Sequence, residues 1–204
     1  MLALSGLRRL LEQASQASPE ALCQRCGAGM TAQHGHVADL ETRALLCVCA
    51  RCLADATRVS GVAEKPVPRR FHMLGPEDIP ESVWASLEVP VGIAFFFHNS
   101  RLGRSVAAYP SPAGATESLL PPAAWEGLLA TLPPALAPAP DVEALLVRRT
   151  HEVSESFIVP IDACYELVGR IRSHWTGFGG GPEAREAIDR FFLELRASSA
   201  SAGT

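Results

Sequence analysis

The chain has 204 residues, 48% of them hydrophobic, and a formal net charge of -4 at pH 7. That size allows a small module plus a medium domain with a buried core, and the acidic balance does not favour nucleic acid as a partner. No stretch reaches the ~18 apolar residues of a membrane helix, and Arg8 and Arg9 interrupt any export signal. We therefore expect a cytoplasmic protein with no membrane span.

Leucines recur at helical spacing near the N-terminus, at Leu4, Leu7 and Leu11, which predicts an amphipathic helix within residues 1–19. Charge is uneven along the chain. Residues 1–70 hold nine Lys/Arg and six Asp/Glu, whereas the remainder holds nine and sixteen. The N-terminal part is therefore mildly basic and the larger part is acidic.

Residues 20–58 contain five of the six cysteines. Cys23 and Cys26 are separated by two residues, and so are Cys49 and Cys52. Each pair lets one tight turn present two thiolates to one ion, and two pairs supply the four ligands of tetrahedral zinc. In a reducing compartment, clustered cysteines favour a metal over disulfides. The spacing predicts a zinc-binding module with these four ligands.

Iron is the alternative metal, since four thiolates at this spacing resemble a rubredoxin-type centre. The pair Cys23 and Cys26 is followed by a glycine that suits such a turn. Leu53 follows the second pair where the matching glycine would stand. The sequence therefore favours zinc over iron.

Cys47 and two histidines, His34 and His36, complicate the ligand set. Three interpretations of Cys47 remain open. It is a small core residue at the end of a strand, or it replaces Cys49 as a ligand, or it forms a second site with His34 or His36. If the segment is extended, both imidazoles lie on one side, and His36 is the better ligand candidate because it leads into an apolar run.

Proline and glycine are frequent in residues 59–83, which predicts an extended linker with an edge strand near residues 69–73. A second domain is expected over residues 84–197. Its first part predicts a β-hairpin formed by Val89–Phe97 and Arg104–Tyr109.

A turn cluster at Pro110–Gly114 precedes a predicted helix whose apolar positions include Trp125 and Leu128. The apolar run Val142–Arg149 predicts a central strand, and Ser156–Val159 a partner strand.

Two amphipathic helices are predicted to close the domain, the first capped by Asp162 and the second starting near Pro182. Cys164 lies on the apolar face of the first helix, as expected of a core residue. Residues 198–204 predict a disordered tail. The fold class expected is α+β: a small treble-clef-like zinc module, and a mostly antiparallel β-sheet domain packed with helices.

The cysteine module resembles the treble-clef scaffold of HNH-type nucleases related to phage recombination endonuclease VII. Those enzymes place an Asp-His pair at the metal and an Asn after the last cysteine pair. This chain has Gln33-His34 and, after Cys52, Leu53. The resemblance implies the scaffold, and a metal-dependent nuclease using His34 or His36 is one alternative function.

A second resemblance spans nearly the whole chain. The segments that carry it are the two cysteine pairs with Leu45–Cys47, Tyr109–Ser118, Pro140–Val147 and Val159–Val168. Together they resemble an uncharacterised, mainly actinobacterial family of about 200 residues encoded beside uptake [NiFe] hydrogenase genes. The resemblance implies an accessory or maturation role with hydrogenase subunits or maturation factors as partners.

We therefore expect a non-enzymatic zinc-binding accessory protein that interacts with another protein. The alternatives are the HNH-like nuclease and a rubredoxin-like iron module for electron transfer.

Overall fold

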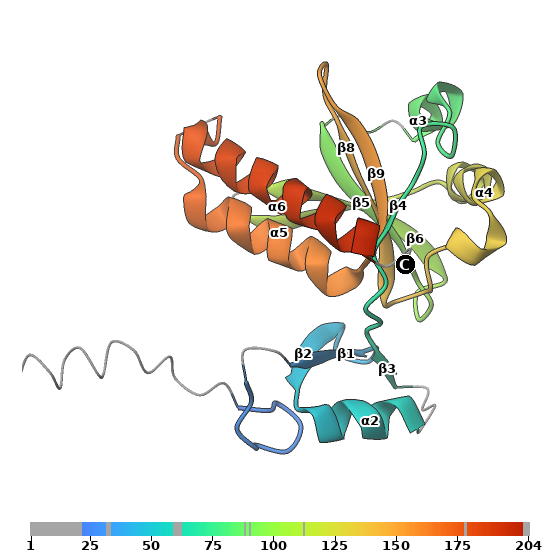
Figure 1. Ribbon diagram of the computed structural model, residues 1–204. Coiled ribbons are helices and arrows are strands. Elements are labelled where there is room, and N and C mark those ends of the chain that lie inside the picture. Colours follow the sequence, from blue (N-terminus) through green and yellow to red (C-terminus); the bar gives the residue numbers. More distant parts are fainter. Residues whose placement is uncertain are drawn as a thin grey trace, which may run out of the picture. The chain divides into compact units, whose positions relative to one another are not determined.

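The computed structural model describes residues 22–31, 34–58, 63–87, 89, 91–111, 113–177 and 179–201. The chain divides into two compact units, Met1–Pro66 and Val67–Thr204 (Figure 1). The helix predicted within residues 1–19 lies outside the described residues. Within the described part of the chain, no helix has the length and apolar character needed to cross a membrane.

The first unit contains a β-hairpin, a third strand and a helix. Its elements are β1 (Gly35–Asp39), β2 (Ala44–Val48), α2 (Ala50–Arg58) and β3 (Glu64–Pro66). The strands pair antiparallel in the order β2-β1-β3. The turn between β1 and β2 forms because Asp39 accepts hydrogen bonds from the N–H groups of Glu41 and Thr42, at 2.8 and 3.0 Å.

The core of the first unit is small. Its cluster of buried side chains consists of Cys23, Val37, Val48, Cys52 and Ala56. These residues come from the loop before β1, from one face of the hairpin and from α2. A cysteine pair, a hairpin and then a helix is the treble-clef-like order expected from the sequence.

Gly35 lets α2 approach the hairpin closely. A Cβ atom at this position would lie 2.5 Å from Cδ2 of Leu53, a residue of α2. The missing side chain therefore leaves room for helix packing on that face of β1.

The second unit is built on an antiparallel sheet with the strand order β4-β9-β8-β5-β6-β7. Its strands are β4 (His72–Met73), β5 (Ile93–Asn99), β6 (Arg104–Ser111), β7 (Gly114–Leu119), β8 (Glu143–Arg149) and β9 (Ser154–Pro160). Its helices are α3 (Glu81–Ser86), α4 (Pro122–Thr131), the short 3-10 helix η1 (Pro134–Leu136), α5 (Ile161–His174) and α6 (Gly181–Ser201).

Helices cover both faces of this sheet. Figure 1 shows α5 and α6 side by side on one face, and α3 and α4 on the other. Phe95 points toward Tyr165 of α5, with ring centroids 5.8 Å apart, whereas Phe96 points toward Trp84 of α3, at 6.4 Å. Both phenylalanines are fully buried. Burial on both faces explains why β5 is continuously apolar instead of alternating.

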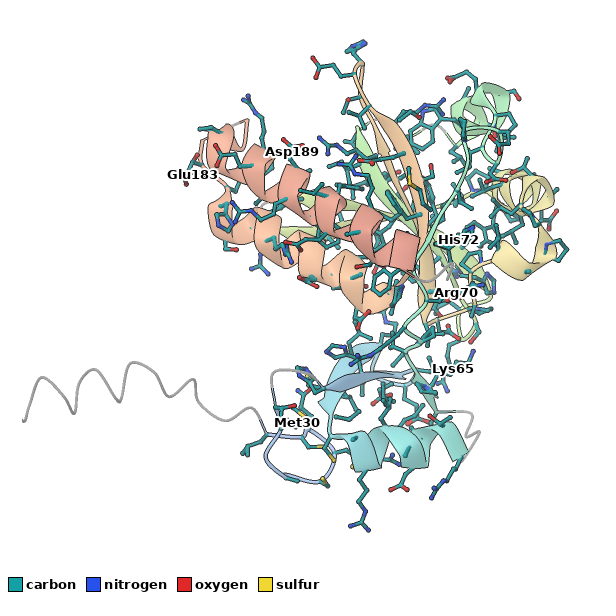
Figure 2. The ribbon with its side chains drawn as sticks, viewed as in Figure 1. Met30, Lys65, Arg70, His72, Glu183 and Asp189 are labelled. Carbon is teal, nitrogen blue, oxygen red and sulfur yellow. The ribbon has the colours of Figure 1, made fainter. Side chains whose placement is uncertain are left out.

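One buried ion pair joins the start of the second unit to its central sheet. The Arg70 guanidinium (labelled in Figure 2) donates to both carboxylate oxygens of Glu143, at 2.8 and 2.6 Å. It also donates to the carbonyl oxygens of Ala135 and Ala137. The Glu143 side chain is only 3% exposed, so this pairing is what makes its burial tolerable.

The structure confirms the α+β class, the mostly antiparallel sheet and the predicted pairings of β5 with β6 and of β8 with β9. The sequence analysis did not predict the short helix α3 or the strand β7, which follows the turn cluster directly. The stretch 59–83, expected as a linker, contains β3, the edge strand β4 and the start of α3.

The prediction for the start of α5 was wrong. Pro160 occupies the N-cap position, and Asp162 lies inside the first turn, where its carboxylate accepts a hydrogen bond from its neighbour's N–H at 2.9 Å. Its charge still suits the helix N-terminus. At the other end of the domain α6 runs to Ser201, into the predicted tail, and residues 202–204 lie outside the described residues.

Candidate metal centre

The first cysteine pair lies in a tight turn before β1. The N–H of Gly27 donates to the carbonyl oxygen of Cys23 at 2.8 Å, and the N–H of Cys23 donates to that of Ala28, also at 2.8 Å. Gly27 has a φ of +72°, a left-handed conformation that glycine adopts without strain. This turn directs Cys23 and Cys26 to one side.

The second cysteine pair marks the start of α2. Cys49 immediately precedes the helix, and Cys52 lies in its first turn. The Arg25 side chain links the two pairs, because it donates to the carbonyl oxygen of Cys52 at 3.1 Å and forms an ion pair with Glu64 at 3.4 Å. The start of α2 therefore positions Cys49 and Cys52, and the tight turn before β1, here called the knuckle turn, positions Cys23 and Cys26.

The four thiols converge on one point. The sulfur atoms of Cys23, Cys26, Cys49 and Cys52 all lie within 4.8 Å of one another. The Sγ atoms of Cys26 and Cys49 are 3.8 Å apart. Four sulfurs at about 2.3 Å from a tetrahedral zinc ion would be about 3.8 Å apart. The donor set and its spacing therefore fit one thiophilic metal ion such as zinc.

Local hydrogen bonds already favour one thiolate. The N–H of Cys49 donates to Sγ of Cys23 at 3.3 Å, and this bond lowers the pKa of Cys23 to about 6 against the opposing effect of burial. Burial, followed by its thiol neighbours, raises the pKa of Cys52 to about 12. Without a cation, four adjacent thiols cannot all ionise, because each thiolate opposes the next. A bound dication removes that conflict.

Cys47 is separate from these four thiols. Its sulfur lies within 4.8 Å of ring nitrogens of His34 and His36, and this group is half-buried. The sulfur that lies with those of Cys23, Cys26 and Cys52 belongs to Cys49, and Cys47 is not in that group. Nor is Cys47 fully buried. The structure places Cys47 beside the two histidines named in the third interpretation.

The sequence did not indicate the pairing of His98 with Ser105. These residues face each other across β5 and β6, and Nδ1 of His98 lies 3.1 Å from Oγ of Ser105. In the described part of the chain, no carboxylate hydrogen-bonds to His98, so the pair lacks the third member of a hydrolase triad. It is a polar cross-strand contact.

Cys164 lies in the core, as expected. Its side chain is fully buried in α5, and that burial, with a smaller effect of the Asp162 carboxylate, raises its pKa well above 9.0. A thiol held protonated in this way is a poor nucleophile.

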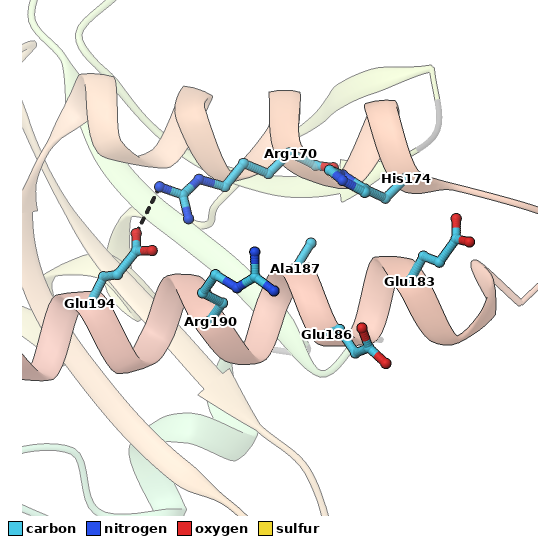
Figure 3. A pocket seen from close by; sticks show the side chains of 7 residues that line it. All are labelled: Arg170, His174, Glu183, Glu186, Ala187, Arg190 and Glu194. Atoms are coloured by element: carbon cyan, nitrogen blue, oxygen red, sulfur yellow. Dashed lines mark hydrogen bonds and ion pairs between the residues drawn. The ribbon is translucent and has the colours of Figure 1, made fainter.

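A groove of about 380 Å³ lies between α5 and α6 (Figure 3). Both signs of charge line it, and Arg170 forms ion pairs with Glu166 and Glu194 at 2.6 and 2.7 Å. These bonds raise the pKa of Arg170, with Glu194 as the largest contributor. Of the charged side chains that line the groove, Arg170 and Glu194 pair with each other across the two helices.

Comparisons with known proteins place the chain in a family. No curated protein and no solved structure matches it significantly. A family model described as "Family of unknown function (DUF5947)" matches residues 22–199, which include both cysteine pairs and every strand of the second unit's sheet. The chain therefore belongs to this family of unknown function.

Proposed function

We propose that the protein is a non-enzymatic accessory protein in which one zinc ion, bound by Cys23, Cys26, Cys49 and Cys52, holds the first unit in its fold. The observation that carries the proposal is the convergence of four thiols whose sulfur atoms all lie within 4.8 Å of one another. The zinc would supply structural cross-linking between the knuckle turn and the start of α2.

The size of the first unit's core supports a structural role. Among the described residues, its core cluster holds just three buried apolar side chains besides the cysteines, those of Val37, Val48 and Ala56, and Ala38 and Leu40 are buried outside that cluster. Burial of one valine stabilises a fold by about 1.5–3 kcal/mol, whereas ordering each residue costs about 1–2 kcal/mol. A unit of this size needs further stabilisation, and structural zinc contributes roughly 10–16 kcal/mol in isolated fingers.

The choice of zinc over iron rests on the second cysteine pair. It lies at a helix start followed by Leu53, and it lacks the glycine turn of a second rubredoxin-type knuckle. The accessory role, with hydrogenase subunits or maturation factors as partners, rests on the family resemblance described above. Co-purification of those subunits with the tagged full-length protein would test the partner.

Elemental analysis of the purified full-length protein tests the metal. We expect zinc, and we expect Cys26→Ser to lower the zinc content by one ion per chain. Cys26 is the exposed member of the set, so its substitution disturbs packing least. Cys164→Ala is the matched control, because it removes a thiol from the second unit and should leave the zinc content unchanged.

Chelation tests the structural role. All three tryptophans, Trp84, Trp125 and Trp175, lie in the second unit. After chelation, hydrogen exchange should accelerate throughout β1, β2 and α2, while tryptophan fluorescence stays unchanged. Full protection of α2 in the metal-free protein would contradict a structural zinc. A red, redox-active protein containing iron would replace the proposal with the electron-transfer alternative.

A further inference from the structure

We propose that His34, His36 and Cys47 form a second metal site, separate from the four-cysteine site, that binds a zinc-like divalent ion and leaves one coordination position open. The two sites share no ligand, but the second site uses the β1–β2 hairpin, which the four-cysteine site is proposed to stabilise.

Strand register brings the three side chains together. His36 and Cys47 are directly opposed across the antiparallel strands β1 and β2. Cross-strand partners point to the same face, about 4.5–5.5 Å apart at Cβ. His34 precedes His36 by two residues and so reaches the same face, and their ring centroids are 4.9 Å apart at an interplanar angle of 73°.

The two proposed sites lie on opposite faces of the hairpin. Val37 and Leu46 form the neighbouring cross-strand pair, and both pack in the first unit's core together with Cys52 of α2. Because side chains alternate along a strand, His36 and Cys47 point away from that core. Gly35 separates the two histidines and faces α2. In His34-Gly35-His36, the glycine therefore lies on the face of the hairpin that packs against α2, and the two imidazoles lie on the opposite face.

The donor atoms suit a borderline metal ion. One sulfur and two imidazole nitrogens all lie within 4.8 Å of one another. In a tetrahedral zinc site with bonds of about 2.0–2.3 Å, such donor atoms are about 3.3–3.6 Å apart. Rotation of the three side chains can bring the donor atoms this close together. Imidazole and thiolate together select zinc and its transition-metal neighbours over magnesium or calcium.

Three protein ligands leave room for an exogenous one. Among the described residues, no fourth His, Cys, Asp or Glu joins this group, and its three members are half-buried, with Nε2 of His34 shielded from solvent. Three ligands with an accessible fourth position are typical of zinc sites that bind water or another small ligand, whereas four thiolates form a closed site.

Metal titration of the full-length protein tests the inference, with Zn²⁺ and Co²⁺ as probes. We expect two ions per wild-type chain, and one ion per chain in His36→Ala/Cys47→Ala. His151→Ala, which removes a histidine from the second unit, is the control and should still bind two. The remaining Co²⁺ in the double variant should show the absorption of an all-thiolate tetrahedral site.

Added imidazole tests the open position. It should shift the visible absorption of the second Co²⁺ equivalent in wild type and leave the spectrum of the double variant unchanged. Binding of a single ion by wild type, retained in the double variant, would overturn the second site and leave the four-cysteine site standing. A single ion lost in the double variant but kept in Cys26→Ser would support the His/Cys site and contradict the four-cysteine proposal.

Discussion

The ion pair between Arg70 and Glu143 gives a stability prediction whose size follows from the structure. Arg70→Ala removes two of the three hydrogen bonds to the Glu143 carboxylate and leaves only the N–H of Ala139, at 2.8 Å. The carboxylate is 3% exposed, so the charge left behind is buried and poorly compensated. Breaking a buried pair in this way costs about 3–5 kcal/mol.

The lower part of that range is expected here. The Arg70 side chain is 34% exposed, so water already reaches part of the guanidinium and moderates what the pair contributes. We therefore expect Arg70→Ala to lower the free energy of unfolding of the second unit by about 3 kcal/mol, or its Tm by roughly 10 °C. Urea unfolding followed by tryptophan fluorescence measures this unit alone, because the first unit has no tryptophan.

Arg149→Ala is the matched control. Arg149 pairs with Glu81, whose side chain is 76% exposed, and stacks over Trp84 at 5.2 Å. The Arg149 side chain is 23% exposed and Trp84 is half-buried, so the ion pair and the cation–π contact together contribute about 1–2 kcal/mol. If Arg70→Ala cost no more than this control, the argument from the buried carboxylate would be refuted. Adding Glu143→Gln to Arg70→Ala should restore part of the loss, because the amide carries no charge.

Three further outcomes are expected. Iodoacetamide should modify Cys26 in the chelated protein, but it should modify Cys164 only after global unfolding. Peptide mass spectrometry measures both reactions, and modification of Cys164 in the native protein would contradict its burial. Burial raises the pKa of Glu155 above its ordinary 4.5, opposed by two arginines, so the native state keeps a proton that the unfolded chain has lost. The stability that Glu155 contributes is therefore present below pH 4.5 and is lost as the pH rises through the folded-state pKa. Urea titrations at a series of pH values should show this decline in the free energy of unfolding for wild type and not for Glu155→Gln. Gly181 has a φ of +76°, and a Cβ atom at this position would lie 2.2 Å from a hydroxyl oxygen, so Gly181→Ala should lower the free energy of unfolding by at least about 1–2 kcal/mol. Gly127 lies in α4 with open space around it, so Gly127→Ala should raise the free energy of unfolding by about 0.5–1 kcal/mol. Equal melting temperatures for the two variants would contradict both expectations.

The convergence of the four thiols could be anticipated because each cysteine pair is a local constraint. Two residues between cysteines suit a tight turn or a first helical turn, and either geometry presents both sulfurs to one side. The environment of Cys47 could not be decided in the same way. It depends on the register of β1 against β2, which the turn at Asp39 sets, and a shift of one residue would direct Cys47 to the other face.

The elements missed by the sequence lack the usual signals. The strand β7 contains Gly114 and Glu117, lies at the sheet edge and is mostly exposed, so it has no alternating apolar pattern. The helix α3 has six residues and none of them is buried. Aspartate is a common N-cap residue, which is why the sequence predicts Asp162 as the cap. In the structure Pro160 is the N-cap, because it has the extended backbone geometry that precedes a helix, with φ -56° and ψ 143°.

The strand order of the second unit has a consequence for how this unit folds. Short connections join β5, β6 and β7 into one meander and β8 and β9 into one hairpin, whereas β5 and β8 pair across roughly fifty residues. The two local pieces can form independently, and joining them requires closing a long loop that contains α4. We expect that joining step to limit the refolding rate, so substitutions between β5 and β8 would slow refolding more than equally destabilising ones at the β6–β7 edge.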